Sequence, residues 1–282
     1  MRVVLHLAGS KSKSRHLALA QTMATGIRAA GFKVSVLPRD AREADPTADM
    51  AVIYGLAGTA SGLMEAYGSR VGFVDKAYFG RQFFLRFVPG SIHPQGDFRS
   101  ADPAAFLRTG DTIRNSPHPG DAILLAGDSG KGSQFFGSED ARTAHVTAVE
   151  KLKEVVGSEA LIVYRPKPSW RDGRPIEGTY FDNLERPIDS ILNRAHAVVT
   201  WASNAAVDAI RWDRPTVLLG PGGALHGWLP TELSKVTLTA RLDGTLRREL
   251  IYGLARYQWK LSDFARGETW LAIKEQQKHV RH

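Results

Sequence analysis

The sequence predicts an α/β protein built from two tandem Rossmann-like domains. Short aliphatic and β-branched runs alternate with stretches of helical periodicity, most of these runs are apolar throughout, and a proline-containing segment divides them into two sets. Continuous apolar strands are typical of parallel sheets that helices cover on both faces. The alternation of strand and helix is typical of doubly wound sheets with right-handed crossovers.

The first set of strands precedes residue 91. We expect strands at Val3–Leu7, Lys33–Leu37, Met50–Tyr54 and Arg70–Val74, with a helix at Leu17–Ala30. Each strand is a short apolar run bounded by polar or glycine residues, which places these segments in one buried sheet.

Residues 91 to 120 form the connection between the two sets. Pro94, Pro103, Pro117 and Pro119 lie here among glycine and polar residues, so we expect a linker with one short helix at Ala104–Leu107.

The second set repeats the pattern of the first. We expect strands at Ala122–Ala126, Leu161–Tyr164, Ala197–Trp201 and Thr216–Leu219, and helices at Ala141–Val156, Ile188–Arg194 and Asn204–Trp212. In open α/β sheets ligands bind beyond the carboxyl ends of the strands, so candidate site residues are sought there.

The segment after residue 244 has no strand pattern. Apolar residues recur at three- and four-residue steps from Leu246 to Phe264, which predicts one amphipathic helix that Gly267 ends. We therefore expect a first domain at 1–118, a second domain at 119–244 and C-terminal helices at 245–282.

Composition bounds the function. The chain has 282 residues, 43% hydrophobic and 23% charged, and a net charge of +8, and it contains no cysteine. Disulfides, thiolate zinc sites and cysteine nucleophiles are thereby excluded. No apolar run approaches the ~20 residues of a membrane span, and we expect a cytoplasmic protein. The basic surplus suits nucleic acid, a phosphorylated small molecule or an anionic membrane surface, and plain solubility is the alternative.

Small polar residues follow the third strand of the second set. In "AVVTWASNAAVDAI" the predicted strand runs into Ser203 and Asn204, and a helix begins there. Such a turn directs free backbone N–H groups and the positive end of the helix dipole toward an anion. The alternative is that Ser203 only caps its helix.

Three further segments of the second half follow predicted strands. "LLGPGGALHGW" offers Gly222 and Gly223 for close backbone approach and His226 for a hydrogen bond to phosphate, or it is a flexible turn with a surface histidine. In "RPKPSW" the prolines hold Arg165 and Lys167 on an extended backbone that suits a diphosphate, or the two are a solvated pair.

The segment "LLAGDSGKGSQFFG" resembles a phosphate loop without matching one. Leu125 stands where a Walker A motif requires its first glycine, counting back from Gly130 and Lys131. A P-loop kinase is therefore disfavoured, although Ser129, Lys131 and backbone amides remain candidates for binding an anion.

The first half offers a candidate general base. "VGFVDKAYFGR" places Asp75 at the tip of a buried strand, followed by Lys76, Tyr78 and Arg81, which are candidates for binding an acceptor; a turn-capping role is the alternative for Asp75.

A second segment of the first half is basic. "LAGSKSKSRH" supplies Lys11, Lys13, Arg15 and His16, which could contact phosphates of a donor or a polyanionic acceptor.

Several motifs are missing. The sequence contains no D-x-D triad, no HExxH and no G-x-S-x-G, so it favours a metal-independent site made of amides, cations and one carboxylate.

At these residues the sequence resembles a family. "YRPKPS" and "PIDSILNRAHAVVTWASNAAVDAIRWDRPTVLLGPGG" are similar to segments of capsule-polysaccharide-type and phage-encoded glycosyltransferases of the GT-B type, and "FVDKAYFGR" and "ARYQWKLSDFARGETW" also resemble phage proteins. The similarity covers about half of the chain. One departure is Lys167, where many relatives have histidine.

The resemblance implies two Rossmann-like domains that face each other across a cleft. The second domain would hold a nucleotide-diphosphate sugar such as a UDP-sugar as co-substrate, with no other cofactor, and the first would hold the acceptor. The C-terminal helical arm would cross back to the first domain. Arg165, Lys167, Ser203, Asn204 and His226 would then stabilise the leaving group, and Asp75 would take the acceptor's proton if the enzyme inverts.

The acceptor is harder to predict. The basic surplus and the phage-like segments favour a hydroxymethylated pyrimidine in double-stranded DNA, with Arg247, Arg248, Arg256 and Arg266 on phosphates and Trp170 or Phe79 as stacking residues or core. A capsule or lipid-linked glycan is the alternative acceptor, and a non-catalytic nucleotide or nucleic-acid-binding module is the alternative class.

Overall fold

The computed structural model describes residues 1–7, 14–38, 41, 43–56, 59–94, 96, 98–99, 101–115, 120–137, 140–168, 170, 173–236 and 241–280, with the side chains of 14–15 and 276–280 left out. It divides the chain into two compact units. Unit 1 comprises Met1–Asp97 and Leu254–His282, and unit 2 comprises Phe98–Gly253.

These boundaries differ from the expected ones. Residues 98–118 and 245–253 belong to unit 2, although the sequence analysis assigned them to the first domain and to the C-terminal helices. The reason is a set of contacts within unit 2: Arg247 donates to Asn115 Oδ1 and pairs with Asp213 at 2.9 Å, and the ring of Tyr252 lies 5.9 Å from that of Phe106.

Unit 1 is built on a six-stranded sheet with the order β11-β5-β4-β3-β1-β2. Its strands are β1 (Arg2–His6), β2 (Lys33–Leu37), β3 (Met50–Tyr54), β4 (Val71–Lys76), β5 (Phe84–Pro89) and β11 (Gln258–Lys260). The first four are parallel to one another, as expected, whereas β5 runs antiparallel to both of its neighbours, β4 and β11; neither β5 nor β11 was predicted.

Helices α1 (Ser14–Ala29), α9 (Leu261–Arg266) and α10 (Glu268–Val280) pack with this sheet around one core, which includes Phe264 and Trp270. Glycine permits the closest contact: a Cβ on Gly26 of α1 would lie 1.5 Å from the carbonyl oxygen of Phe264 on α9. Helix α2 (Ala60–Tyr67) and the 3-10 turn η1 (Gly68–Arg70) precede β4.

The prediction of a single helix from Leu246 to Phe264 is wrong. Helix α8 (Gly244–Ala255) ends before β11, which pairs with β5 through Gln258 and Arg86, and α9 begins after it. The three- and four-residue apolar spacing continues through this strand, so periodicity alone could not detect the interruption. Gly267 does end α9, with a φ of 88° that favours glycine.

Unit 2 is built on a five-stranded parallel sheet with the order β10-β9-β6-β7-β8. Its elements are α3 (Ala104–Leu107), β6 (Ala122–Ala126), α4 (Gly130–Phe135), α5 (Ala141–Val156), β7 (Ile162–Arg165), β8 (Tyr180–Phe181), α6 (Ile188–Leu192), β9 (Ala195–Thr200), α7 (Ala205–Arg211), β10 (Thr216–Leu218) and the 3-10 turn η2 (Leu233–Val236). The predicted strands of this half are confirmed to within two residues at each end.

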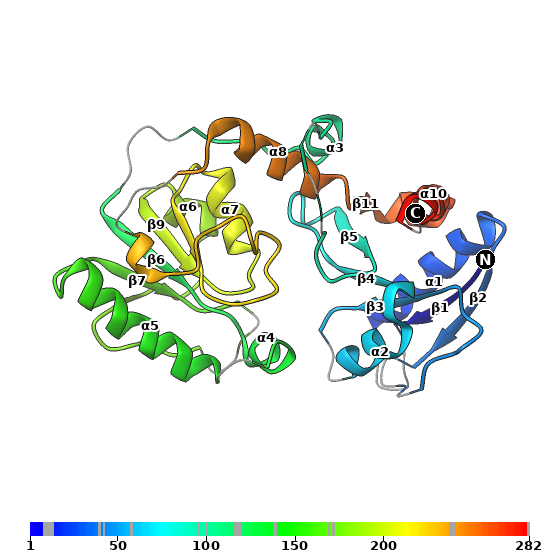
Figure 1. Ribbon diagram of the computed structural model, residues 1–282, viewed down its shortest axis with the longest axis horizontal. Coiled ribbons are helices and arrows are strands. Elements are labelled where there is room, and N and C mark those ends of the chain that lie inside the picture. The colour runs from blue at the N-terminus through cyan, green and yellow to red at the C-terminus, as the bar shows by residue number, and fades with distance from the viewer. Residues whose placement is uncertain are drawn as a thin grey trace. The chain divides into compact units, whose positions relative to one another are not determined.

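Helices cover both faces of this sheet (Figure 1). Ile123 and Leu125 of β6 share a buried cluster with α5, whereas Leu124 and Ala126 share another with α6 and α7. Alternate side chains of one apolar strand therefore enter opposite cores, as the sequence predicted. Helix α5 begins where Asp140 accepts the backbone N–H groups of residues 142 and 143.

None of the helices among the described residues is long and apolar enough to cross a membrane.

Candidate functional site

The carboxyl ends of four strands in unit 2 lie level with one another. Ala126 of β6 is in register with Arg165 of β7 and Thr200 of β9, and Thr200 is in register with Leu218 of β10. The loops after these strands therefore leave the sheet at one edge, which we call the donor edge. The residues predicted to bind a donor follow these strand ends, except Arg165, which is itself the last residue of β7.

The turn after β6 is organised around a buried carboxylate that the sequence analysis missed. Asp128 Oδ1 accepts the backbone N–H of Ser129 at 2.8 Å and the ammonium of Lys167 at 2.9 Å. The side chain of Asp128 is 6% exposed and that of Lys167 is 35% exposed. Asp128 thus brings together Ser129 and Lys167, two of the residues predicted to bind a donor. In the ion pair of Asp128 and Lys167, the ammonium is the group that reaches solvent.

A buried histidine lies beneath this turn. His145 of α5 is 1% exposed, its Nε2 lies 3.0 Å from the backbone nitrogen of Asp128, and its Nδ1 lies 3.0 Å from the hydroxyl of Tyr164. Burial lowers the pKa of His145 to about 4. The sequence marks this residue only as one member of a predicted helix.

The other predicted cation is held inside the protein. Arg165 is buried, forms an ion pair with Asp182 and donates to the carbonyl oxygen of Arg186 at 3.0 Å. Its guanidinium stabilises the chain after β8, and this placement does not support the predicted contact with a donor.

Ser203 caps its helix, which was the alternative to an anion-binding role in the sequence. Its Oγ accepts the backbone N–H of Ala205 at 3.2 Å, at the first residue of α7. Asn204 occupies the N-cap position without a side-chain capping bond. Both residues lie at the donor edge, and the described contact of Ser203 is a structural one.

The glycines after β10 meet neighbouring side chains. Gly222 has a φ of 76°, and a Cβ there would lie 2.1 Å from the ring of Phe136; a Cβ on Gly223 would lie 2.9 Å from Leu218. Packing and backbone conformation therefore require glycine here independently of any ligand. His226 is exposed beyond them.

The remaining predicted donor residues follow β6. Ser129 is buried, and its carbonyl oxygen accepts the backbone N–H of Gly132 at 2.8 Å. Lys131 is exposed on α4. Lys131 and Lys167 are thus the predicted donor-edge cations whose side chains reach solvent.

In unit 1 the predicted general base, Asp75, forms an ion pair with a buried arginine, Arg86. Asp75, at the end of β4, accepts the backbone N–H of Lys76 at 2.8 Å and a guanidinium N–H of Arg86 at 3.2 Å. The side chain of Asp75 is 32% exposed, whereas that of Arg86 is 5% exposed. Arg86 lies over the rings of Tyr78 and Phe73, with 4.9 and 5.8 Å to their centroids. The carboxylate is the member of this pair that reaches solvent.

Tyr78 belongs to the interior. It is 1% exposed, its hydroxyl lies 2.8 Å from His93 Nδ1, and burial raises its pKa to about 12. Gln258 Oε1 accepts the backbone N–H groups of Tyr78 and Phe79, the second at 2.8 Å. The predicted contact of Tyr78 with an acceptor is not supported by this placement, and Phe79, at 1% exposure, is core.

The other predicted acceptor residues are scattered. His16 is buried with its ring 5.4 Å from that of Tyr54, Lys76 is exposed, and Arg81 is exposed with its Nε 3.4 Å from the carbonyl oxygen of Ala77. Lys11 and Lys13 lie outside the described residues, as does the side chain of Arg15.

Several arginines form ion pairs with acidic residues of their own unit. Arg247 is 5% exposed and pairs with Asp213, and Arg211 pairs with Asp189 at 2.7 Å. Arg266 pairs with Asp263 and Glu268 at 2.8 and 2.6 Å. The predicted contacts of Arg247 and Arg266 with DNA phosphates therefore compete with pairs already formed.

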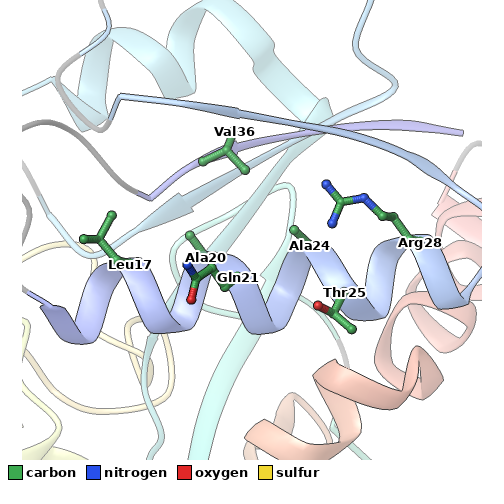
Figure 2. Close-up of a pocket in the computed structure, with 7 residues that line it drawn as sticks. All are labelled: Leu17, Ala20, Gln21, Ala24, Thr25, Arg28 and Val36. Carbon is green, nitrogen blue, oxygen red and sulfur yellow. The ribbon is translucent and has the colours of Figure 1, made fainter.

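A surface groove of about 270 Å³ lies on unit 1. Figure 2 shows it along α1, with Leu17, Ala20 and Arg28 on the helix and Val36 on β2. None of the predicted site residues lines this groove. Among the described residues, no group of three or more histidine and acidic side chains could hold a metal ion, and metal independence stays a prediction.

Two of the solved structures similar to this chain are Kdo transferases. The beta Kdo 2,4 transferase of KpsC from Thermosulfurimonas dismutans superposes with a TM-score of 0.57 at 10% identity, over 92% of each chain. The beta Kdo 2,7 transferase of the same KpsC gives 0.53 at 12% identity, over 95% of this chain and 99% of the other. No protein-family model and no curated protein sequence matches the chain.

This likeness confirms the predicted GT-B class of fold, with two Rossmann-like units in one chain. It also confirms the similarity to capsule-polysaccharide transferases at the level of the fold. At this identity the likeness concerns architecture, so the chemistry depends on the residues described above.

Proposed function

We propose that the chain is a glycosyltransferase that moves a sugar from a nucleotide-sugar donor to a hydroxyl of a glycan. Unit 2 binds the donor at its donor edge, where Lys167 presents an ammonium anchored by Asp128. Unit 1 binds the acceptor, and Asp75 accepts the proton of the attacking hydroxyl.

The observation that carries this proposal is the ion pair at the donor edge. Asp128 is buried and fixes Lys167, so the cation is held in place before any ligand arrives. Cations held beforehand near a leaving phosphate stabilise the charge that develops when the sugar–phosphate bond breaks. Lys131 and the backbone amides of the turn add to this field. UDP-sugars are the first donors to test, and the site needs no metal in this scheme.

The carboxylate in unit 1 supports an acid–base role. Asp75 is one-third exposed and held by Arg86 and the backbone of Lys76. It retains lone pairs for a hydroxyl proton, because each carboxylate oxygen accepts more than one hydrogen bond. This geometry suits a general base in an inverting reaction.

A glycan acceptor is favoured over DNA. The fold likeness is to two Kdo transferases, and two of the arginines predicted to contact DNA are already paired with acids. A hydroxymethylated pyrimidine in DNA remains the alternative acceptor to be tested against it.

Release of free nucleotide tests the proposal. The protein is incubated with UDP-, GDP-, dTDP- and CMP-sugars, with glycan acceptors bearing free hydroxyls or with duplex DNA containing hydroxymethylated pyrimidines. Acceptor-dependent release with a glycan supports the proposal, and release only with DNA replaces the acceptor. Nucleotide binding by calorimetry without release from any donor would indicate a binding module instead.

A further inference from the structure

One imidazole contacts the loops of neighbouring strands at the donor edge. The ring centroid of His145 lies 4.6 Å from that of Trp201 after β9 and 5.2 Å from that of Trp170 after β7. Its Nε2 meets the backbone of Asp128 after β6. Trp201 in turn borders Gly220 after β10, since a Cβ on that glycine would lie 3.2 Å from Trp201. His145 therefore touches, directly or through Trp201, the loops after all four strands.

The hydrogen bonds define the protonation state of His145. A backbone N–H only donates, so Nε2 accepts from Asp128 and carries no proton. The neutral ring then holds its proton on Nδ1 and donates it to the Tyr164 hydroxyl. A doubly protonated ring could not accept the Asp128 N–H. Asp128, Asp140 and Arg142 act on the ring electrostatically.

Glycine lets the turn approach the ring. A Cβ on Gly127 would lie 2.7 Å from His145 Cε1, and a Cβ on Gly132 would lie 2.3 Å from Asp128 Oδ2. Contacts this short exclude a larger side chain without movement of the turn. The backbone N–H of Asp128 thus faces the imidazole, and its carboxylate lies against the first turn of α4.

We propose that His145 is a positioning residue of the donor edge: in its neutral form it fixes the turn from Gly127 to Ser129, so that Asp128 keeps Lys167 in place for the transfer. Its effect on turnover rests on the function proposed above, whereas the held turn is measurable without any reaction. His145 itself is covered by the turn and acts on the donor only through Asp128 and Lys167.

Two amide substitutions separate its contacts. In His145→Gln the side-chain amide extends to the position of Nε2 and can accept the Asp128 N–H. In His145→Asn the shorter amide extends only to the position of Nδ1, so it keeps the contact with Tyr164 and loses the one with Asp128. We expect His145→Asn to lower kcat roughly tenfold to hundredfold, as small displacements at a site do. In the native protein we expect kcat to decline as the pH approaches 4, because protonation of His145 Nε2 breaks the bond from the Asp128 N–H. His145→Gln should keep most of the native kcat and should not show this decline. A purely structural role would lower the melting temperature of both variants without separating their kcat values.

Amide exchange gives the independent readout. The Asp128 amide, followed by NMR in the full chain, should exchange slowly in the native protein and in His145→Gln and much faster in His145→Asn. If His145→Asn unfolds, Tyr164→Phe removes the Nδ1 partner, keeps the ring and should also speed exchange. Equal exchange and equal pH profiles in all variants would overturn the proposal. Protected exchange in a protein that turns over no donor would refute the transferase function and leave the held turn intact.

Discussion

The two units carry similar polar clusters with opposite members exposed. In unit 1 the cation of the Asp75–Arg86 pair is buried and the carboxylate is one-third exposed; in unit 2 the carboxylate of the Asp128–Lys167 pair is buried and the ammonium is one-third exposed. A buried tyrosine–histidine hydrogen bond lies beside each pair.

This difference indicates which ligand each unit suits. In each pair the buried charge is stabilised by its partner and by nearby dipoles. It therefore stays buried and holds the exposed side chain in a fixed orientation. Unit 1 thereby presents a negative group, fit to accept a proton, and unit 2 presents a positive group, fit to bind phosphate. A pyrophosphate would be repelled at the first and attracted at the second.

The largest expected effect tests the exposed carboxylate. Asp75→Asn keeps the shape of the side chain and removes its basicity, so kcat should fall by about 10²–10⁴ while the donor Kd stays the same. Kinetics of transfer and calorimetry with the nucleotide measure the two. Glu65→Gln, an exposed acid on α2, is the matched control. Unchanged kcat in Asp75→Asn would remove the acid–base role from unit 1.

The buried histidine of unit 2 should make stability depend on pH. His145 becomes protonated below pH about 6.5 in the unfolded chain, but only near pH 4 in the folded protein. The free energy of unfolding therefore falls as the pH falls through this window. The contribution is on the order of 3 kcal/mol, at 1.36 kcal/mol per pKa unit. His145→Gln should lack it in urea unfolding, and exposed His226→Gln should retain it. His93 in unit 1, whose pKa burial also lowers, keeps part of the dependence in every variant.

A smaller effect is expected for the exposed ammonium. Lys167→Met removes one charge-assisted hydrogen bond to phosphate, so the donor Kd should rise about tenfold, or about 1.4 kcal/mol. Calorimetry with the nucleotide alone measures it, with Lys151→Met on α5 as the control. The same Kd in Lys167→Met would move the donor away from the donor edge.

The smallest expected effect distinguishes the acceptors. With a neutral glycan, raising salt from 50 to 200 mM should change the rate by less than about twofold, because few phosphate contacts form. A DNA acceptor held by several cations would lose affinity by a factor of about 10³ or more over the same range. Transfer rates at several salt concentrations decide between them.

The sequence predicted the elements whose signal is local. Apolar runs such as Ala122–Ala126 gave the parallel strands, and Asp75 and Lys167 were found because each follows such a run. The antiparallel β5 was missed because Arg86 and Pro89 interrupt its apolar character, and the three-residue β11 is too short to show a period.

The candidate site was predictable only in part, for the same reason. His145 lies 17 positions after Asp128, and Asp182 lies 17 after Arg165, so only the fold brings each pair together. A pattern read along the chain assigns Arg165 to solvent or ligand, and the structure assigns it to Asp182. Buried polar partners are a tertiary property that local periodicity does not contain.

The contact of α9 with Gly26 has a consequence for biosynthesis. The core of unit 1 includes Phe264 and Trp270, so on a translating ribosome this unit stays incomplete until the segment that carries them has emerged. The inserted unit, continuous from Phe98 to Gly253, can fold before that moment. The inserted unit would thus be completed before the unit that flanks it, and a stop codon shortly before residue 260 would leave residues 1–97 without one wall of their core.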